Sequence, residues 1–187
     1  FFLPRMLDVP GKSNGAWMEY FWWEVRNFGY QSPYIAEMTN LDWLLLDLLA
    51  NRAGLPLHRF LGADRDWAAV YKGGGSVLLS DEALIQDLQR FKDEGYQTTK
   101  FKIGGSGAGF SQDIRRLEKA RRALGDDFGI AVDANQAWDA KTAFAFAKEA
   151  APFGVAWLEE PVHAYDMDAL RELRDLLDNA GIVMEIA

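Results

Sequence analysis

Three short apolar segments that end in charged residues decide the fold of this chain. Residues 98–103 read TTKFKI, residues 130–135 read IAVDAN and residues 155–161 read VAWLEEP. Helix-length segments with apolar residues at helical spacing separate them, so strand and helix alternate at intervals of about 25–30 residues. This alternation predicts parallel βα units, whose strands are apolar because such sheets are covered by helices.

The same pattern extends along the chain from about residue 66. The expected strands are 67–71, 98–103, 130–134, 155–159 and 182 onward, and the expected helices begin at or next to Ser80, Ser111, Asp139 and residue 166. Before them, a leucine stripe predicts a helix at 40–53, opened by a capping box from Thr39 to Asp42.

Residues 1–38 are rich in aromatic side chains that are interrupted by proline and glycine. They show no clean period, which predicts a loop-rich segment with one short helix near residues 15–27. Two roles fit such a segment, the filling of a core or interface and the covering of a ligand.

Composition excludes several classes of function. The chain has 187 residues, and its 20 Lys and Arg against 28 Asp and Glu give a net charge of −8 without a basic cluster, which argues against nucleic acid and anionic membranes as partners. It has no cysteine, so disulfides, thiolate zinc sites and cysteine nucleophiles are excluded, and a cytoplasmic location is expected. The apolar stretch 41–50 contains Asp42 and Asp47, so no transmembrane helix is expected. Because the chain begins at Phe1 and ends within an apolar run at Ala187, we expect a piece of a longer protein.

Two closures of the sheet fit the alternation, an open doubly wound sheet and a (β/α)8 barrel. A dinucleotide-binding doubly wound fold would have a G-x-G-x-x-G fingerprint after its first strand. The glycine-rich segment Gly104–Gly109 has no such triplet, so we expect a flexible loop there rather than a phosphate cradle.

Side chains alternate along a strand, which assigns the charged residues to one face. Lys100 and Lys102 share a face, and by the same count Asp133, Asn135 and Glu159 point inward, away from the covering helices. In a barrel these residues would meet at the carboxyl ends of the strands, where active sites lie.

Charged groups in such a place are either paired or hold a metal ion. Two carboxylates from adjacent strands, without Cys or His, suit a hard cation such as Mg²⁺. Two lysines on one face repel each other, so one or both are expected to have a lowered pKa, as a general base would. The alternative is a structural ion-pair network in which the lysines neutralise the carboxylates.

Taken together, Lys-x-Lys, Asp-Ala-Asn and Glu-Glu-Pro on successive strands resemble the enolase superfamily, in its mandelate racemase and muconate lactonizing enzyme-like branch. Residues 41–62 also resemble the helix and linker that lead from that family's capping domain into its barrel. The resemblance implies an α/β fold, with residues 63–187 forming the first half of a (β/α) TIM-type barrel truncated at its fifth strand. Residues 1–62 would be the C-terminal, mainly helical part of the capping domain and its linker.

The family's chemistry implies a role for each matching residue. Asp133 and Glu159 would bind Mg²⁺, Lys102 would be the acid/base residue, and Lys100 would support it electrostatically. Further contacts around the ligands or to the substrate are expected from Asn135, Glu160 and His163.

The implied activity is Mg²⁺-dependent abstraction of a proton α to a carboxylate through an enolate, which makes the protein a lyase or an isomerase. Dehydration of an acid sugar is favoured, and racemisation, epimerisation and cycloisomerisation are the alternatives within the superfamily. From another class, a non-catalytic paralogue that binds a metabolite or a protein would keep the same fold. The expected partners are a small hydroxylated carboxylate and further copies of the full-length chain in a homo-oligomer.

Two points depart from the family pattern. The third metal ligand normally ends the fifth strand, so it is either Glu185, which lies 26 residues after Glu159, or a residue beyond Ala187. The opposing acid/base residue belongs to later strands. Tyr71 and Trp138 flank the expected barrel mouth, where they would either line it or pack.

Overall fold

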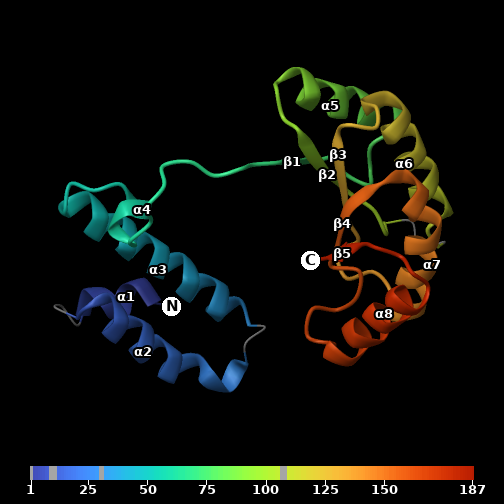
Figure 1. Cartoon of the computed structure of the whole chain (residues 1–187). Coiled ribbons are helices and arrows are strands. Elements are labelled where there is room, and N and C mark those ends of the chain that lie inside the picture. The colour runs from blue at the N-terminus through green and yellow to red at the C-terminus, as the bar shows by residue number, and fades with distance from the viewer. Residues whose placement is uncertain (1, 9–11, 30–31, 106–108) are drawn as a thin grey trace. The chain divides into compact units, whose positions relative to one another are not determined.

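The computed structural model divides the chain into two units, Phe1–Ala68 and Ala69–Ala187, each of which has its own apolar core (Figure 1). It describes residues 2–8, 12–29, 32–105 and 109–187.

The first unit is helical. Trp17, Phe21 and Val25 follow one another at four-residue spacing, so a single stripe of helix α2 is buried in the core of this unit. The short helix expected near residues 15–27 is confirmed as α2, whereas the expectation of a loop-rich segment around it is wrong, because α1 and the first turns of α3 are helical too. The core-filling role is the one that the structure shows. The elements are α1 (Phe2–Asp8), α2 (Asn14–Val25), the 3₁₀ turn η1 (Arg26–Phe28), α3 (Pro33–Arg52) and α4 (Leu57–Phe60).

Helix α3 begins earlier than the leucine stripe predicts. It starts at Pro33, and proline is favoured at the first helical position because its missing N–H has no partner there in any case. The expected capping box at Thr39 is wrong, since the Thr39 hydroxyl donates to the carbonyl of Ile35 inside the helix, at 3.0 Å. Leu41 and Leu45 pack on the core, whereas Leu44 is exposed.

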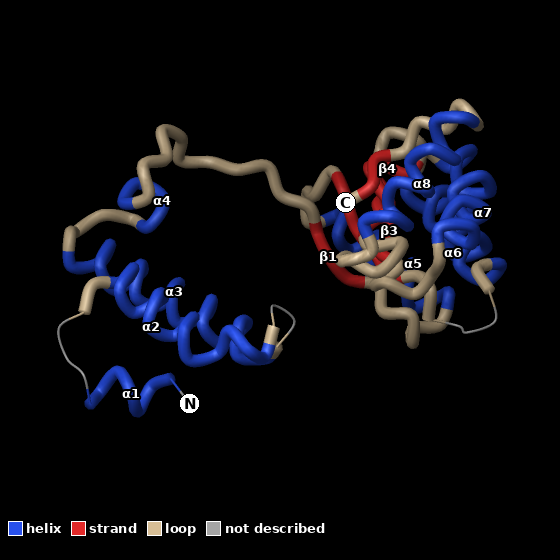
Figure 2. The backbone as a smooth tube through the Cα atoms, turned by 90° about the horizontal axis from the view of Figure 1, so that it is seen from below, coloured by secondary structure: helices blue, strands red, loops and turns tan. Residues whose placement is uncertain are grey.

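The second unit is a parallel sheet whose strands lie side by side in the order of the sequence. This order, β1-β2-β3-β4-β5, lacks the reversal of a doubly wound sheet. Helices α5 to α8 lie along one side of the sheet, as in the wall of a barrel (Figures 1 and 2). The structure thus confirms the partial (β/α) barrel. The elements are β1 (Lys72–Gly74), α5 (Asp81–Asp93), β2 (Thr98–Lys102), α6 (Ser111–Leu124), β3 (Gly129–Asp133), α7 (Ala140–Ala150), the 3₁₀ turn η2 (Ala151–Phe153), β4 (Val155–Glu159), α8 (Met167–Asn179) and β5 (Glu185–Ile186).

Helices in this unit begin at the capping residues that the sequence predicts. The Ser80 hydroxyl accepts the N–H of Ala83, and the Asp139 carboxylate accepts the N–H of Thr142, at 3.2 and 2.7 Å. Each cap satisfies a backbone donor that the first turn of a helix leaves free. The apolar faces of these helices pack with the outward side chains of the strands in one core.

The first strand is displaced from its expected position at residues 67–71. It lies at Lys72–Gly74 and so includes two of the three consecutive glycines 73–75. A Cβ at Gly74 would lie 2.7 Å from the ring of Phe91, and a Cβ at Gly75 would lie 2.5 Å from the Cβ of Phe101. The glycines are therefore needed because this strand passes close to α5 and β2.

Arg121 on α6 joins two loops at the amino ends of β3 and β4. Its guanidinium donates to the carbonyls of Phe153, Gly154 and Phe128, at 2.8, 3.0 and 2.6 Å. We expect Arg121→Met to lower the free energy of unfolding by about 2–4 kcal/mol, because two partly buried carbonyls and the exposed carbonyl of Gly154 lose their donor together. Urea denaturation of the protein measures this loss.

The neighbouring Arg122 provides the matched control. Its guanidinium pairs with Glu118 one helical turn away, and both side chains are exposed. We expect Arg122→Met to change the stability by less than about 0.5 kcal/mol. Equal losses for the two variants would contradict the role given to Arg121.

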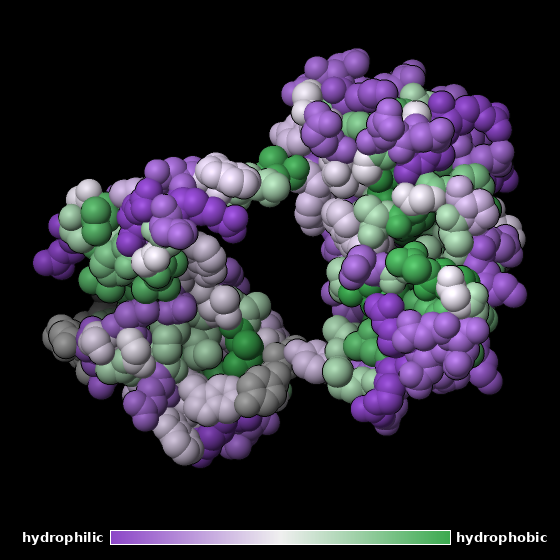
Figure 3. Space-filling model, viewed as in Figure 1, coloured by the Kyte–Doolittle hydropathy of each residue, from purple (hydrophilic) through white to green (hydrophobic). Residues whose placement is uncertain are grey.

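Apolar side chains also reach the surface of both units (Figure 3). On α3 they include Trp43, Leu44 and Leu48, and Val183 precedes β5 in the second unit. Across the described parts of the chain, none of the helices combines the length and the apolar character that crossing a membrane requires.

Candidate active site

The charged ends of three neighbouring strands lie level with one another. Lys102 of β2 pairs in register with Asp133 of β3, which pairs in register with Glu159 of β4. Phe101 and Leu158 are fully buried in the core on the helix side, so the charged residues next to them in sequence point to the opposite face. The alternation read from the sequence therefore holds at the strand ends.

Both lysines contact the same carboxylate oxygen. Lys100 Nζ and Lys102 Nζ lie 2.9 and 2.7 Å from Asp133 Oδ2, and Lys100 Nζ also lies 2.5 Å from Glu159 Oε1. The Lys100 side chain is 16% exposed and the Lys102 side chain is 39% exposed. Lys100 is thus the more enclosed cation, and Lys102 has the more open approach.

The electrostatics of the cluster correct one expectation. Burial alone would lower the pKa of Lys100, but hydrogen bonds and charges from Glu159 and Asp133 outweigh it and raise the pKa of this lysine above its usual value. Burial alone would likewise raise the pKa of Asp133, and the hydrogen bonds from Lys102, Lys100 and the N–H of Asn135 lower it. The idea that mutual repulsion lowers the pKa of Lys100 is therefore wrong, because the carboxylates between the lysines dominate.

Asn135 and Glu160 follow the strand ends in strained backbone conformations. Asn135 has φ 51° and Glu160 has φ 41°, in the left-handed region that side chains other than glycine rarely adopt. The N–H of Asn135 donates to Asp133 Oδ1 at 2.9 Å, and its side-chain amide donates to Glu160 Oε2 at 3.2 Å. Asn135 Oδ1 in turn accepts from Lys102 Nζ at 3.2 Å. Both residues therefore join the cluster, as neighbours of Asp133 and Lys102.

Other candidate residues lie elsewhere in the described structure. His163 is exposed in the loop after β4, where its Nδ1 accepts the N–H of Tyr165 at 3.3 Å. The ring of Trp138 packs against Phe110 and Phe146, so it belongs to the core and not to the mouth.

Glu185 is not level with the other two carboxylates. It pairs in register with Trp157, two residues before Glu159. The residue of this strand that is level with Glu159 is Ala187, whose N–H donates to the carbonyl of Leu158 and whose carbonyl accepts the N–H of Glu160.

Sequence reasoning missed Trp157. Its indole Nε1–H donates to Glu159 Oε2 at 3.0 Å, and its ring meets that of Tyr71 edge-on, with 5.0 Å between centroids. Tyr71 in turn lies under Lys100, with 5.9 Å from Nζ to the ring centroid. The available signal was the position of Trp157 two residues before Glu159, which places both on one face of a strand.

The cluster has the type of ligand atom that a divalent cation prefers, but it has too few such ligands to hold the cation alone. Asp133 and Glu159 offer carboxylate oxygens from adjacent strands, which are the ligands that Mg²⁺ prefers. The ammonium groups of Lys100 and Lys102 contact these oxygens, so positive charge already gathers where a cation would be held. Within the described residues, no group of three His, Cys, Asp or Glu side chains comes together to hold a metal.

Two hollows adjoin residues of this cluster. One of about 260 Å³ is lined by Lys102, Asn135 and the backbone of the glycines that follow β2. Another, of about 580 Å³, lies over Lys100, Lys102 and the β1 glycines. Gly104 is described and its N–H donates to Asp113 Oδ2, whereas residues 106–108 of the expected flexible loop lie outside the described residues.

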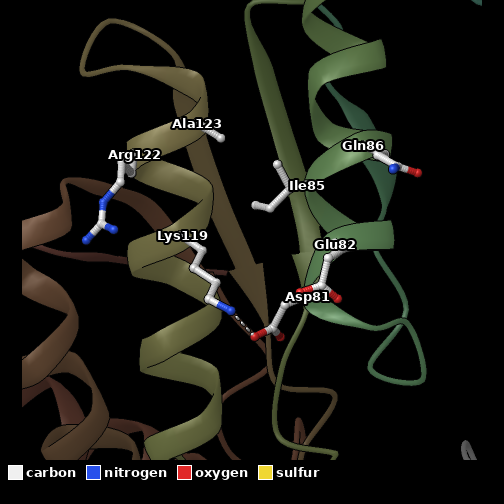
Figure 4. A pocket seen from close by; sticks show the side chains of 7 residues that line it. All are labelled: Asp81, Glu82, Ile85, Gln86, Lys119, Arg122 and Ala123. Atoms are coloured by element: carbon white, nitrogen blue, oxygen red, sulfur yellow. Dashed lines mark hydrogen bonds and ion pairs between the residues drawn. The ribbon is translucent and has the colours of Figure 1, made fainter.

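A separate hollow of about 430 Å³ lies between α5 and α6 (Figure 4). Its polar wall is the ion pair between Asp81 and Lys119, at 2.6 Å, and Ile85 lines it as well. Because its lining comes from the helical layer, it takes no part in the lysine–carboxylate cluster.

Residues 83–187, which include the cluster, match the model of a protein family described as "Enolase C-terminal domain-like". The chain belongs to this family. The match spans more than half of the chain and contains β2 to β5, so it includes the lysine–carboxylate cluster and confirms the resemblance drawn from the three motifs.

Within the family, the chain is similar to enzymes that act on acid sugars. It is 35% identical over 157 residues to L-talarate/galactarate dehydratase of Salmonella typhimurium, an alignment that covers 83% of this chain and 39% of that protein. It is 32% identical over 164 residues to 3,6-anhydro-alpha-L-galactonate cycloisomerase of Streptomyces coelicolor, with 88% and 42% covered. The chain thus spans about two fifths of the length of these curated relatives.

Solved structures of related proteins have a fold similar to that of this chain. The 3,6-anhydro-D-galactonate cycloisomerase from Zobellia galactanivorans superposes with a TM-score of 0.84 at 26% identity, over 100% of this chain and 50% of that one. The Salmonella typhimurium dehydratase liganded with Mg and L-lyxarohydroxamate gives 0.81 at 31% identity, over 96% and 45%.

Proposed function

We propose that the protein containing this chain is a Mg²⁺-dependent enzyme that removes a proton α to a carboxylate through an enolate. The observation that carries the proposal is the shared contact of Lys100 and Lys102 with Asp133 at the level of Glu159, on the ends of three adjacent strands. Family membership and relatives that include a Mg-liganded dehydratase support it.

The two lysines divide the work by their surroundings. Lys102, the more open one, would take the α proton at Nζ, and Asn135 and Asp133 would hold that nitrogen in place. Lys100, the more enclosed one, would stabilise the negative charge that develops on the substrate carboxylate.

Asp133 and Glu159 are the residues that would hold Mg²⁺. Bound there, the ion would supply Lewis-acid stabilisation of the substrate carboxylate. Asn135 and Glu160, which are joined by a hydrogen bond, would brace Asp133 from the side of the loops. For His163, contact with the substrate remains our proposal, based on its position two residues after the Glu-Glu-Pro segment.

The substrate class that we propose is a hydroxylated carboxylic acid, with dehydration of an acid sugar as the reaction. The dehydratase relative supports this choice, while the cycloisomerase relative and an epimerase at 33% identity support the alternative outcomes after the same first step. A non-catalytic paralogue would keep the cluster without proton exchange.

Solvent deuterium exchange tests the common step. In D₂O, the protein is expected to incorporate deuterium α to the carboxylate of galactarate or related acid sugars when Mg²⁺ is present. EDTA should abolish the incorporation, because the carboxylates then hold only lysine ammonium groups. Exchange that persists without a divalent cation would refute the proposal, and product analysis separates dehydration from epimerisation and cyclisation.

We also propose the wider setting of the chain. Residues 1–62 would be the C-terminal part of a capping domain with its linker, and residues 63–187 the first half of the barrel. The exposed Trp43, Leu44 and Leu48 on α3 support a full-length homo-oligomer or further packing within the full-length protein. A cytoplasmic location is consistent with the absence of cysteine.

A further inference from the structure

Glu159 has a different partner on each of its two carboxylate oxygens. Oε1 accepts from the Lys100 ammonium at 2.5 Å, whereas Oε2 accepts from the indole Nε1–H of Trp157 at 3.0 Å. An indole N–H is a neutral donor that does not titrate, so its bond persists whatever cation sits on the other oxygen.

The backbone of β4 brings the indole to this position. Between Ile130 and Val132 the pairing of β3 with β4 shifts, because the next partner after Val155 is Leu158, three residues on. Val155 and Leu158 both pack on the helix side, so the extra residue lies between Val155 and Trp157, and regular alternation then places Trp157 and Glu159 together on the inner face. Register shifts of this kind re-aim side chains next to active sites.

The ring of Trp157 is also held from its other side. It meets Tyr71 edge-on at an interplanar angle of 71°, with 5.0 Å between centroids, and is itself half-buried. Edge-to-face packing limits rotation of the indole and so fixes the direction of its N–H. Tyr71, Trp157 and Lys100 thus form one connected support beneath Glu159.

We propose that Trp157 is a positioning residue that fixes the rotation of the Glu159 carboxylate and thereby keeps Oε1 available to a divalent cation. The inference rests on the proposed function, since it assigns Glu159 to the metal. Hydrogen bonds to the outer side of a ligand carboxylate typically change metal affinity 10- to 100-fold when removed.

Trp157→Phe tests this role, because phenylalanine keeps a ring against Tyr71 and lacks the N–H donor. In a calorimetric titration with Mn²⁺, we expect the dissociation constant of the variant to rise about 10- to 100-fold. Trp138→Phe is the matched control: the same substitution in the core of the same unit should leave the constant within about twofold of the original protein.

The outcomes separate the two proposals. Mn²⁺ binding that is equal in Trp157→Phe and the original protein overturns the role of Trp157 and leaves the metal site standing. Failure of the original protein to bind Mn²⁺ overturns the metal site and this inference with it.

Nuclear magnetic resonance gives a second readout that does not depend on the folding of Trp157→Phe. The tryptophans, seven of them in this chain, give indole N–H signals, and the one from Trp157 should shift in the folded Glu159→Gln variant, since its acceptor loses its charge. An unchanged set of indole signals in that variant would overturn the inference.

Discussion

Replacement of Lys102 by methionine is expected to slow deuterium exchange α to the substrate carboxylate by about 10³-fold, the effect typical of losing a positioned general base. Methionine keeps the unbranched stem and removes the ammonium that lies 2.7 Å from Asp133 and 3.2 Å from Asn135. Lys100 cannot take over, because Asp133 and Glu159 hold it enclosed and charged. Mass spectrometry of substrate recovered from D₂O measures the loss.

The control for Lys102 is another lysine of the same unit. Lys148 lies on α7 and its ammonium packs over the ring of Phe144, so Lys148→Met should retain the exchange rate within about twofold. Mg²⁺ binding should survive in the Lys102 variant, since Asp133 and Glu159 remain. Exchange at the original rate in Lys102→Met would show that the proton goes to another group.

The strand ends of the site could be predicted from the sequence because a strand has a fixed period of two. Phe101 is apolar and packs against the helices, so Lys100 and Lys102 had to face away from them. Parallel strands end at one edge of a sheet, and this brings Asp133 and Glu159 beside the lysines although they are distant in sequence. Local periodicity and topology suffice for this part of the site.

The rest of the site depends on departures from regular structure that no period reveals. The shift in register between β3 and β4 places both Val155 and Leu158 on the helix side, which strict alternation would not do. The positive φ angles of Asn135 and Glu160 arise because hydrogen bonds in the loops hold these residues there. The position of Glu185 along the sheet depends on how β5 pairs with β4. Its distance of 26 residues from Glu159 in the sequence does not reveal this pairing.

The raised pKa of Lys100 also depends on contacts that the sequence does not reveal. The sequence shows that the two lysines share one face of a strand, which suggests that they repel each other. It does not show how closely the carboxylates approach their ammonium groups. In the structure, Asp133 accepts from both ammonium groups through a single oxygen. Attraction to a shared anion at contact distance outweighs repulsion between cations that lie on either side of it.

Asp133→Asn should have the second large effect, on metal binding. Asp133 is almost fully buried and accepts from Lys100, Lys102 and the N–H of Asn135. Asparagine keeps the shape and loses the charge, so we expect Mg²⁺ affinity to fall by at least about 100-fold, beyond what the loss of an outer partner causes. The increase in melting temperature on adding Mg²⁺ measures this loss. Asp139→Asn is the control, since asparagine also caps helices and Asp139 lies outside the cluster.

Lys100→Met is expected to change metal binding in the opposite direction, and this contrast decides between a metal site and an ion-pair network. Without Lys100, Asp133 and Glu159 lose a shared cation and repel each other, so the metal-free protein should be less stable. In a metal site Mg²⁺ can replace the missing charge, and its stabilising effect should then be larger in Lys100→Met than in the original protein. In a structural ion-pair network, both Asp133→Asn and Lys100→Met would lower the melting temperature and Mg²⁺ would restore neither. Rescue of Lys100→Met but not of Asp133→Asn is the result that the metal site predicts, because only the first variant keeps both carboxylates.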